Sequence, residues 1–193
     1  MAYVSLPDFK AYVRNELAGT DDGFLQSCLD AATSAINSYC QRNFVPATGV
    51  TSARLYVPDG STLLTIHDCV SVESILSASA NVASSGWQLE PLNGITLDGD
   101  PRPYTQVRLV NGACWYVMIF NKATITVTAD WGWPATPSAV VEATRILARD
   151  VAGQRDVRNG LAVFGDYAAV AVQNRMVKSV LDPLRRAESW GMA

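Results

Sequence analysis

The sequence is poor in the residues that most often carry catalysis or bind metals. It has one histidine and four cysteines in 193 residues. The cysteines form no CxxC pair and show no metal-ligand spacing, and neither a Walker spacing nor a GxSxG motif is present. We therefore predict no cofactor, no metal and reduced core thiols at four positions: Cys28, Cys40, Cys69 and Cys114.

Long apolar runs are also missing. A membrane-spanning helix needs about 18 or more consecutive apolar residues, and no stretch reaches that length. The start of the chain, MAYVSLPDFK, lacks the charged-then-apolar order of a signal peptide. With 49% hydrophobic and 17% charged residues, the composition is that of a globular protein. We predict no membrane association and a chain that stays in the cytoplasm where it is made.

Clustered positive charge is scarce. Residues 1–140 carry 7 basic and 12 acidic groups, a net charge of −5, whereas residues 141–193 carry 8 and 6, a net charge of +2. Neutralising phosphates takes clustered Lys and Arg, and the close basic pair is Arg185-Arg186. This balance argues against nucleic-acid binding, yet it suits a channel through which DNA slides.

Two helices are predicted near the N-terminus. Ser5-Leu6-Pro7-Asp8 has the form of a capping box, and apolar residues follow at helical spacing as far as Leu17, before Gly19. Thr20 or Asp21 caps a second, longer helix. Its apolar face has eight members: Phe24, Leu25, Cys28, Leu29, Ala32, Ile36, Tyr39 and Cys40.

Residues from about 50 to 130 read as short β-strands. The runs ARLYV, TLLTI, VSVESILSA, GWQLEPL, GITLDG, TQVRLV, CWYVMIF and ATITVTADW are separated by turn residues such as Pro58-Asp59-Gly60 and Asn93-Gly94. After them, Thr136-Pro137 begins another helix, a loop runs over 160–165, a short strand over 167–172, and a last helix ends or bends near Pro183. The predicted fold class is α+β: a bundle of about four helices (1–48 and 134–193) with an inserted antiparallel β-lobe (49–133).

Candidate chemistry in the β-lobe is weak. His67 and Cys69 lie two apart in TIHDC, and on a strand such residues are about 7 Å apart, too far for a catalytic dyad. A histidine at a turn or strand end is the default interpretation. Asp98, Asp100 and Asp130 are candidate metal ligands. The segment LDGDPRP lacks the bidentate Glu and the regularly spaced ligands of a calcium loop, and Asp130 does not supply them.

The stretch Trp131-Gly132-Trp133-Pro134 joins the last predicted strand to the next helix. On an extended chain both rings point the same way, and Gly132 lets another backbone approach. One interpretation is a platform on which a ligand stacks. We favour a structural hinge, in which buried rings fasten the β-lobe to the helical core.

Arginines on the later helices are candidate interface residues. Arg145 and Arg149 lie four apart on one helix face, and Arg185 and Arg186 close the last helix. Both pairs suit a solvated surface, and the second pair also suits the negative end of a helix dipole. The alternative is that they meet acidic surfaces of neighbouring subunits.

Four stretches together resemble the head-tail connector, or adaptor, proteins of tailed bacteriophages. They are DDGFLQSCLDAATSAINSYCQRNF, ITVTADWGWPATPSAVVEATRILARDV, GLAVFGDYAAVAV and VLDPLRR. The likeness covers the helical segments at both ends, about half the chain. The β-lobe resembles the longer members of that family in its position along the chain and in its short β-rich runs separated by turns.

The resemblance implies a structural protein of the virion neck with no enzymatic activity. It implies a ring, usually of twelve subunits, that forms in the host cytoplasm beneath the portal protein. The ring extends the DNA channel without sequence-specific binding and docks the next neck, stopper or tail-completion protein. The loop around Phe164, with Tyr167 after it, and the final segment through Arg186 are the expected contacts.

Two other functions stay open at this level. One is a binding module that holds a sugar or peptide on exposed rings of the β-lobe, with four candidates: Trp87, Trp115, Trp131 and Trp133. The other is a small hydrolase built on His67 or Cys69. Exposure of the tryptophan rings discriminates between the binding module and a scaffold, and a screen with hydrolase substrates tests the hydrolase.

Overall fold

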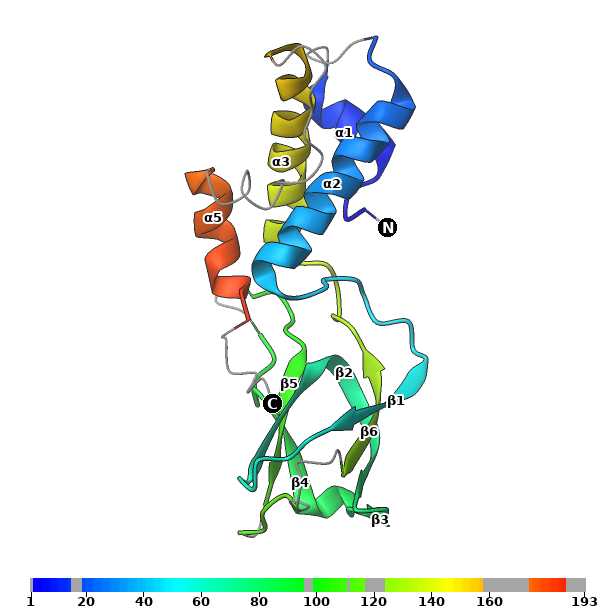
Figure 1. Ribbon diagram of the computed structural model, residues 1–193, viewed down its shortest axis with the longest axis vertical. Coiled ribbons are helices and arrows are strands. Elements are labelled where there is room, and N and C mark those ends of the chain that lie inside the picture. Colours follow the sequence, from blue (N-terminus) through cyan, green and yellow to red (C-terminus); the bar gives the residue numbers. More distant parts are fainter. Residues whose placement is uncertain are drawn as a thin grey trace. The chain divides into compact units, whose positions relative to one another are not determined.

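The protein is represented by a computed structural model that describes residues 2–14, 19–95, 99–110, 112–116, 124–157 and 174–186. The chain folds as two compact units (Figure 1). The helical unit is built from Met1–Phe44 and Thr136–Ser189, and the β-lobe from Val45–Ala135. Over the described residues, four α-helices and a six-stranded antiparallel sheet confirm the α+β class. The arrangement of the helices as a bundle stays a prediction.

Helix α1 spans Leu6–Val13 and begins as the sequence indicates. The Ser5 hydroxyl accepts a hydrogen bond from the Asp8 backbone N–H at 3.3 Å and donates to the Asp8 carboxylate at 2.6 Å. Pro7 sits in the first turn, where its missing N–H costs no hydrogen bond. The helix ends at Val13, before the predicted stop at Gly19, because Arg14 takes a positive φ of 48°.

Helix α2 spans Asp22–Cys40 and buries the predicted apolar face. The Asp21 carboxylate accepts from the Phe24 N–H at 3.0 Å, so Asp21 is the cap. Leu29 and Ile36 are fully buried, and each such side chain stabilises the fold by about 1.5–3 kcal/mol. Phe24 and Tyr39 are half-buried at the rim of this face.

The later helices are α3, Ser138–Val157, and α5, Arg175–Leu181. Asn174 caps α5 by accepting from the backbone N–H groups of Met176 and Val177 at 3.1 and 3.3 Å. The 3-10 turn η2, Asp182–Leu184, then ends the helix at Pro183, as predicted. Met176 is 65% exposed, whereas Val177 and Leu181 of the same helix are buried.

Helix α3 is the centre of the helical unit. It packs against α2, α5 and α1, and α2 lies beside it in Figure 1. Its buried side chains recur at helical spacing: Val140, Ala143, Thr144, Leu147, Ala148, Val151 and Ala152. The Thr144 hydroxyl donates to the Val140 carbonyl at 2.7 Å, which satisfies a polar group that is otherwise enclosed.

The β-lobe is an antiparallel sheet in the order β1-β6-β2-β5-β4, with β3 paired to β2. Its strands are β1 Thr51–Tyr56, β2 Leu63–Ser77, β3 Ala80–Asn81, β4 Trp87–Glu90, β5 Tyr104–Leu109 and β6 Ile125–Trp131, with the 3-10 turn η1 at Ser84–Gly86. Consecutive strands are often not neighbours, because β6 returns between β1 and β2.

Strand β2 joins two runs that the sequence analysis separated. Its first part pairs with β5 and its second part with β6, with register shifts between Thr65 and Cys69 and between Cys69 and Ser71. Such bulges bend a strand, which lets one strand serve two partners. His67 therefore lies inside a strand, and its prediction as a turn or strand-end residue is wrong.

Two other predicted strands differ from the structure. Residues Cys114–Tyr116 carry no regular secondary structure, and Ile95 makes only an isolated bridge to Pro101 among the described residues. Trp115 is nevertheless 2% exposed. Its backbone N–H donates to the Ser61 carbonyl at 3.0 Å, and its ring belongs to the buried cluster of the lobe.

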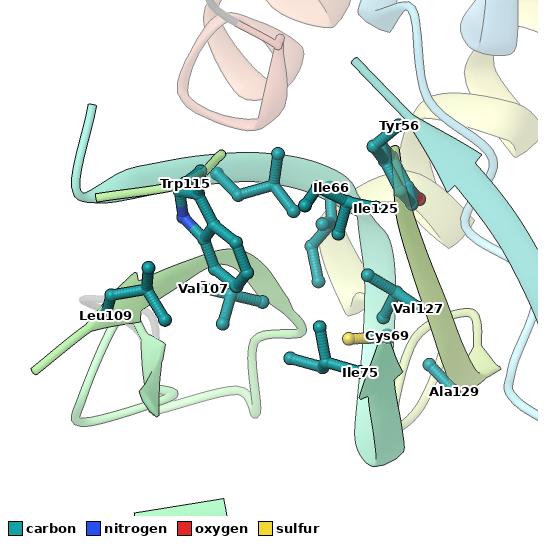
Figure 2. Packing of buried hydrophobic residues seen from close by; sticks show 11 residues of the cluster. Tyr56, Ile66, Cys69, Ile75, Val107, Leu109, Trp115, Ile125, Val127 and Ala129 are labelled. Atoms are coloured by element: carbon teal, nitrogen blue, oxygen red, sulfur yellow. The ribbon is translucent and has the colours of Figure 1, made fainter. Parts of the chain in front are cut away.

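The core of the β-lobe lies on one face of the sheet. Figure 2 shows Trp115 beside Val107, with Ile66, Ile75 and Ile125 in the same cluster. Val107, Ile125 and Val127 are fully buried because alternate residues of β5 and β6 point to this face. The other face of β6 carries Thr126 and Thr128.

Candidate functional site

The corner at residues 131–134 is built around a glycine that admits a second backbone. Gly132 has φ +136°, a conformation that disfavours any side chain. A Cβ placed there would lie 2.8 Å from the Val45 carbonyl oxygen and 2.9 Å from the Ala47 nitrogen. Two backbone hydrogen bonds join the segments: the Trp133 N–H donates to the Val45 carbonyl at 3.0 Å, and the Ala47 N–H donates to the Trp133 carbonyl at 2.8 Å.

Trp133 is bound to strand β2 through its side chain. Its ring is fully buried, and its Nε1–H donates to Asp68 Oδ2 at 3.0 Å. Asp68 is itself 7% exposed, and its backbone carbonyl accepts from the Gly132 N–H at 2.9 Å. Asp68 thus binds the corner through both its side chain and its main chain. The Trp133 Nε1–H gives the buried Asp68 carboxylate the hydrogen-bond donor that it needs away from water.

Trp131 belongs to a second group of side chains. Its Nε1–H donates to the Ser52 carbonyl at 2.8 Å, and the Arg54 guanidinium lies 4.4 Å from its ring centre. Tyr56 and His67 lie beside the ring, with centroids 6.2 Å away in each case. A cation over an indole face is an attractive contact, so Arg54 already covers this ring.

The two tryptophans thus have different hydrogen-bond partners, Ser52 for Trp131 and Asp68 for Trp133. The prediction that both rings point the same way assumed an extended chain, and Gly132 interrupts that conformation. The hinge assigned to residues 131–134 stays a prediction.

His67 and Cys69 are not arranged as a catalytic pair. The Tyr56 hydroxyl contacts His67 Nδ1 at 2.8 Å, and the Cys69 thiol contacts the Tyr104 carbonyl oxygen at 3.8 Å. His67 is exposed, whereas Cys69 is fully buried. Burial raises the pKa of the Cys69 thiol to about 12, which disfavours the thiolate that nucleophilic catalysis requires.

The other tryptophans proposed as a ligand platform are enclosed to different degrees. Trp115 is buried in the lobe, Trp133 is fully buried, and Trp87 packs half-buried against the core of the lobe. A stacking platform needs an open ring face. Among the described residues, the aromatic side chains of the lobe therefore serve mainly to fill its interior.

Arg145 is engaged within the helical unit. Its guanidinium lies 5.8 Å from the Tyr12 ring centre and 3.4 Å from the Glu142 carboxylate. Burial raises the pKa of the Tyr12 hydroxyl, as Glu142 does, while Arg149 and Arg145 oppose the shift. Arg149 is exposed, one turn further along α3.

The closing arginines lie against the end of α2. The Arg186 backbone N–H donates to the Cys40 carbonyl at 3.0 Å, and the Arg185 guanidinium lies 5.7 Å from the Tyr39 ring centre. The Tyr39 hydroxyl also donates to the Asp182 carboxylate, and this bond raises the Tyr39 pKa. Arg185 stays exposed while it makes this contact.

Two predicted contact residues, Phe164 and Tyr167, lie outside the described residues, as does Asp98 of the weak metal candidate. Within the described part of the chain, no group of three or more His, Cys, Asp or Glu side chains is placed to hold a metal ion. Nor does that part contain a helix with the length and apolarity needed to cross a bilayer.

Sequence reasoning missed two residues that organise the corner, Asp68 and Arg54. Asp68 carries a signal in retrospect, because it is a charged residue between the apolar residues of a strand. Arg54 carries none, since its partner Trp131 is 77 residues away in sequence and the pairing of β1 with β6 brings them together.

The fold has relatives among solved structures of assembled particles. A chain in the neck of an empty gene transfer agent (GTA) particle, computed with C6 symmetry, matches with a TM-score of 0.58 and 18% identity over 98% of this chain and 92% of that one. A chain in the virion of a native GTA particle matches with a TM-score of 0.52 and 20% identity, with the same coverage.

A chain in the neck of a native GTA particle, computed with C12 symmetry, matches with a TM-score of 0.50 and 19% identity over 99% of this chain and 97% of that one. No protein-family model and no curated protein sequence matches the chain. At these identities the likeness shows a shared fold. It spans helices and β-lobe together.

Proposed function

We propose that this protein is a structural component of a phage-like virion neck. In this role it forms a ring of twelve subunits beneath the portal, extends the DNA channel and docks the next neck or tail protein. The observation that carries the proposal is the fold match over 98% of this chain and 92% of a chain in a GTA neck. A match of that extent includes the inserted lobe, which the sequence resemblance covered only by position.

The charge of the chain suits a channel for mobile DNA. The net charge is −3, and a wall of that sign repels the phosphate backbone and keeps it from binding tightly. The buried thiol of Cys69 and the enclosed tryptophans support a protein whose side chains maintain shape. We accordingly assign it no enzymatic activity.

Two of the four candidate arginines are the better interface candidates. Arg149 is exposed, and Arg185 is exposed although it lies over the Tyr39 ring, whereas Arg145 is half-buried beside Tyr12. Exposed guanidinium groups suit contacts with acidic surfaces of a neighbouring subunit or of the portal, because complementary charge guides docking. The hinge at 131–134 is part of the same proposal, as the segment that leads from the β-lobe into the helical unit.

Light scattering and negative-stain microscopy of the purified chain, alone and with portal protein, test this function. We expect monomers or weakly associated rings alone and stable rings with portal, because binding to a partner shifts the assembly equilibrium. The double variant R149E/R185E should weaken portal-dependent assembly, while R145Q should leave it unchanged. A stable dimer with two-fold symmetry, or assembly indifferent to portal, would contradict the proposal.

A further inference from the structure

The outward face of the β-lobe carries an uncharged surface that includes large apolar side chains. Cross-strand pairing places Leu55, Thr126 and Leu76 in one row across β1, β6 and β2. Leu55 is 69% exposed and Leu76 is 37% exposed. The next row holds three small uncharged residues: Ala53, Thr128 and Ser74. We call these six residues the outer patch.

The outer patch ends at a strand edge that lacks the usual protection. Among the described residues, β1 pairs with β6 on one side only. Edge strands commonly carry Lys or Pro that block further pairing, and β1 contains neither. Its charged residue, Arg54, is held over the Trp131 ring. Val57, directly after the strand, adds a further 47% exposed apolar side chain.

The opposite edge of the same sheet carries a different apolar feature. Strand β4 is the last strand on that side within the described residues. In the turn after it, Leu92 is 67% exposed and Ile95 is 63% exposed. The turn is held by a bond from the Arg102 N–H to the Gly94 carbonyl at 2.5 Å and by the bridge between Ile95 and Pro101. We call residues 92–95 the apolar turn.

We propose that the outer patch of one subunit receives the apolar turn of the next copy of this chain. This inference rests on the ring proposed above. A closed ring with more than two subunits needs two unlike surfaces on each subunit. This sheet presents one across β1, β6 and β2 and the other in the turn after β4. An uncharged centre with apolar side chains is also the composition of an interface core.

The charges beside the two surfaces are complementary. Glu73 is exposed next to the outer patch, where its carboxylate accepts from the Thr51 hydroxyl at 2.8 Å. Arg102 lies at the base of the apolar turn. A negative group beside the receiving surface and a positive group beside the inserted one fix the direction of docking, whereas two like patches would repel.

Paired cysteines test this contact directly. In a C114S background the other three cysteines are buried, so introduced thiols dominate cross-linking. With rings assembled on portal, L55C/L92C should give a ladder of covalent oligomers, while L55C alone and L92C alone should give none. A ladder from the double variant alone supports the proposal, and covalent dimers from L55C alone overturn it, because they require two like patches to meet.

The same experiment separates this proposal from the proposed function. Rings that form on portal but give no ladder would overturn the contact and leave the ring intact, whereas absence of rings would overturn both. As a second measurement, L55D and L92D should each weaken ring assembly by about tenfold, which is typical of a central interface side chain. M176D, at an exposed apolar residue of α5, is the matched control and should leave assembly unchanged.

Discussion

The Trp133 indole and the Asp68 carboxylate form a buried pair in which Nε1–H donates to Oδ2 at 3.0 Å. The ring is fully buried and the carboxylate is 7% exposed. A carboxylate withdrawn from water needs donors, and a tryptophan provides one together with a large apolar surface. This pair ties the residue after Gly132 to the middle of β2.

Substituting Trp133 should therefore cost more stability than substituting Trp131. W133F removes a donor from a buried charged group, and we expect the free energy of unfolding to fall by about 2–3 kcal/mol. W131F removes a donor from the neutral Ser52 carbonyl and should cost about 1 kcal/mol. Urea unfolding followed by far-UV circular dichroism measures both, and equal losses would argue against a special role for the buried pair.

Gly132 should tolerate no side chain. In G132A the new Cβ would meet three backbone atoms of Val45 and Ala47 at 2.8–3.0 Å while φ stays at +136°. We expect a loss of more than about 2 kcal/mol, since backbone strain alone costs about 1–3 kcal/mol. Thermal unfolding is the measurement.

Gly153 provides the matched control for that substitution. It lies in α3 with nothing within 4 Å of a Cβ, so G153A should raise stability by up to about 1 kcal/mol. A loss in G153A similar to that in G132A would show that the effect does not come from the close approach at residue 132.

Thiol labelling should distinguish one cysteine from the other three. Cys114 is exposed, whereas burial raises the pKa of Cys40 and of Cys69 to about 12. At pH 8 a thiol with that pKa is deprotonated in about one molecule in 10,000. Native protein should take up iodoacetamide at Cys114 alone and denatured protein at all four, as mass spectrometry can count. Rapid native labelling of Cys69 would reopen a nucleophilic role.

The ion pair between Glu90 and Arg108 should make stability depend on pH. Arg108 contacts both carboxylate oxygens of Glu90, and this hydrogen bonding lowers the Glu90 pKa from its usual 4.5. A carboxyl whose pKa is lower in the folded state adds stability above its unfolded pKa and loses it as pH falls through the folded one. Wild type should exceed E90Q in stability at pH 7, and the difference should shrink below about pH 4.5. A difference that is constant from pH 7 to pH 3 would contradict this assignment.

Local features of the fold follow from residues that are close in the chain. Ser5 and Asp21 cap their helices because each side chain accepts a hydrogen bond from the backbone N–H three residues later. Pro183 ends α5 because proline cannot continue a helix. The turn residues likewise indicate where most strands of the sheet begin and end. These signals depend on spacing within one turn or one strand, so sequence alone carries them.

What the sequence determined by itself is the α+β class, the helix starts and the buried helix faces, since hydrophobic spacing and caps act over a few residues. Only the tertiary structure decided that β6 lies between β1 and β2, that two predicted strands form the single bent β2, and that Arg54 covers Trp131. Those outcomes depend on register and on bulges between distant segments. A shift of one residue in register turns every side chain of a strand to the other face, so no local pattern can settle which residues meet.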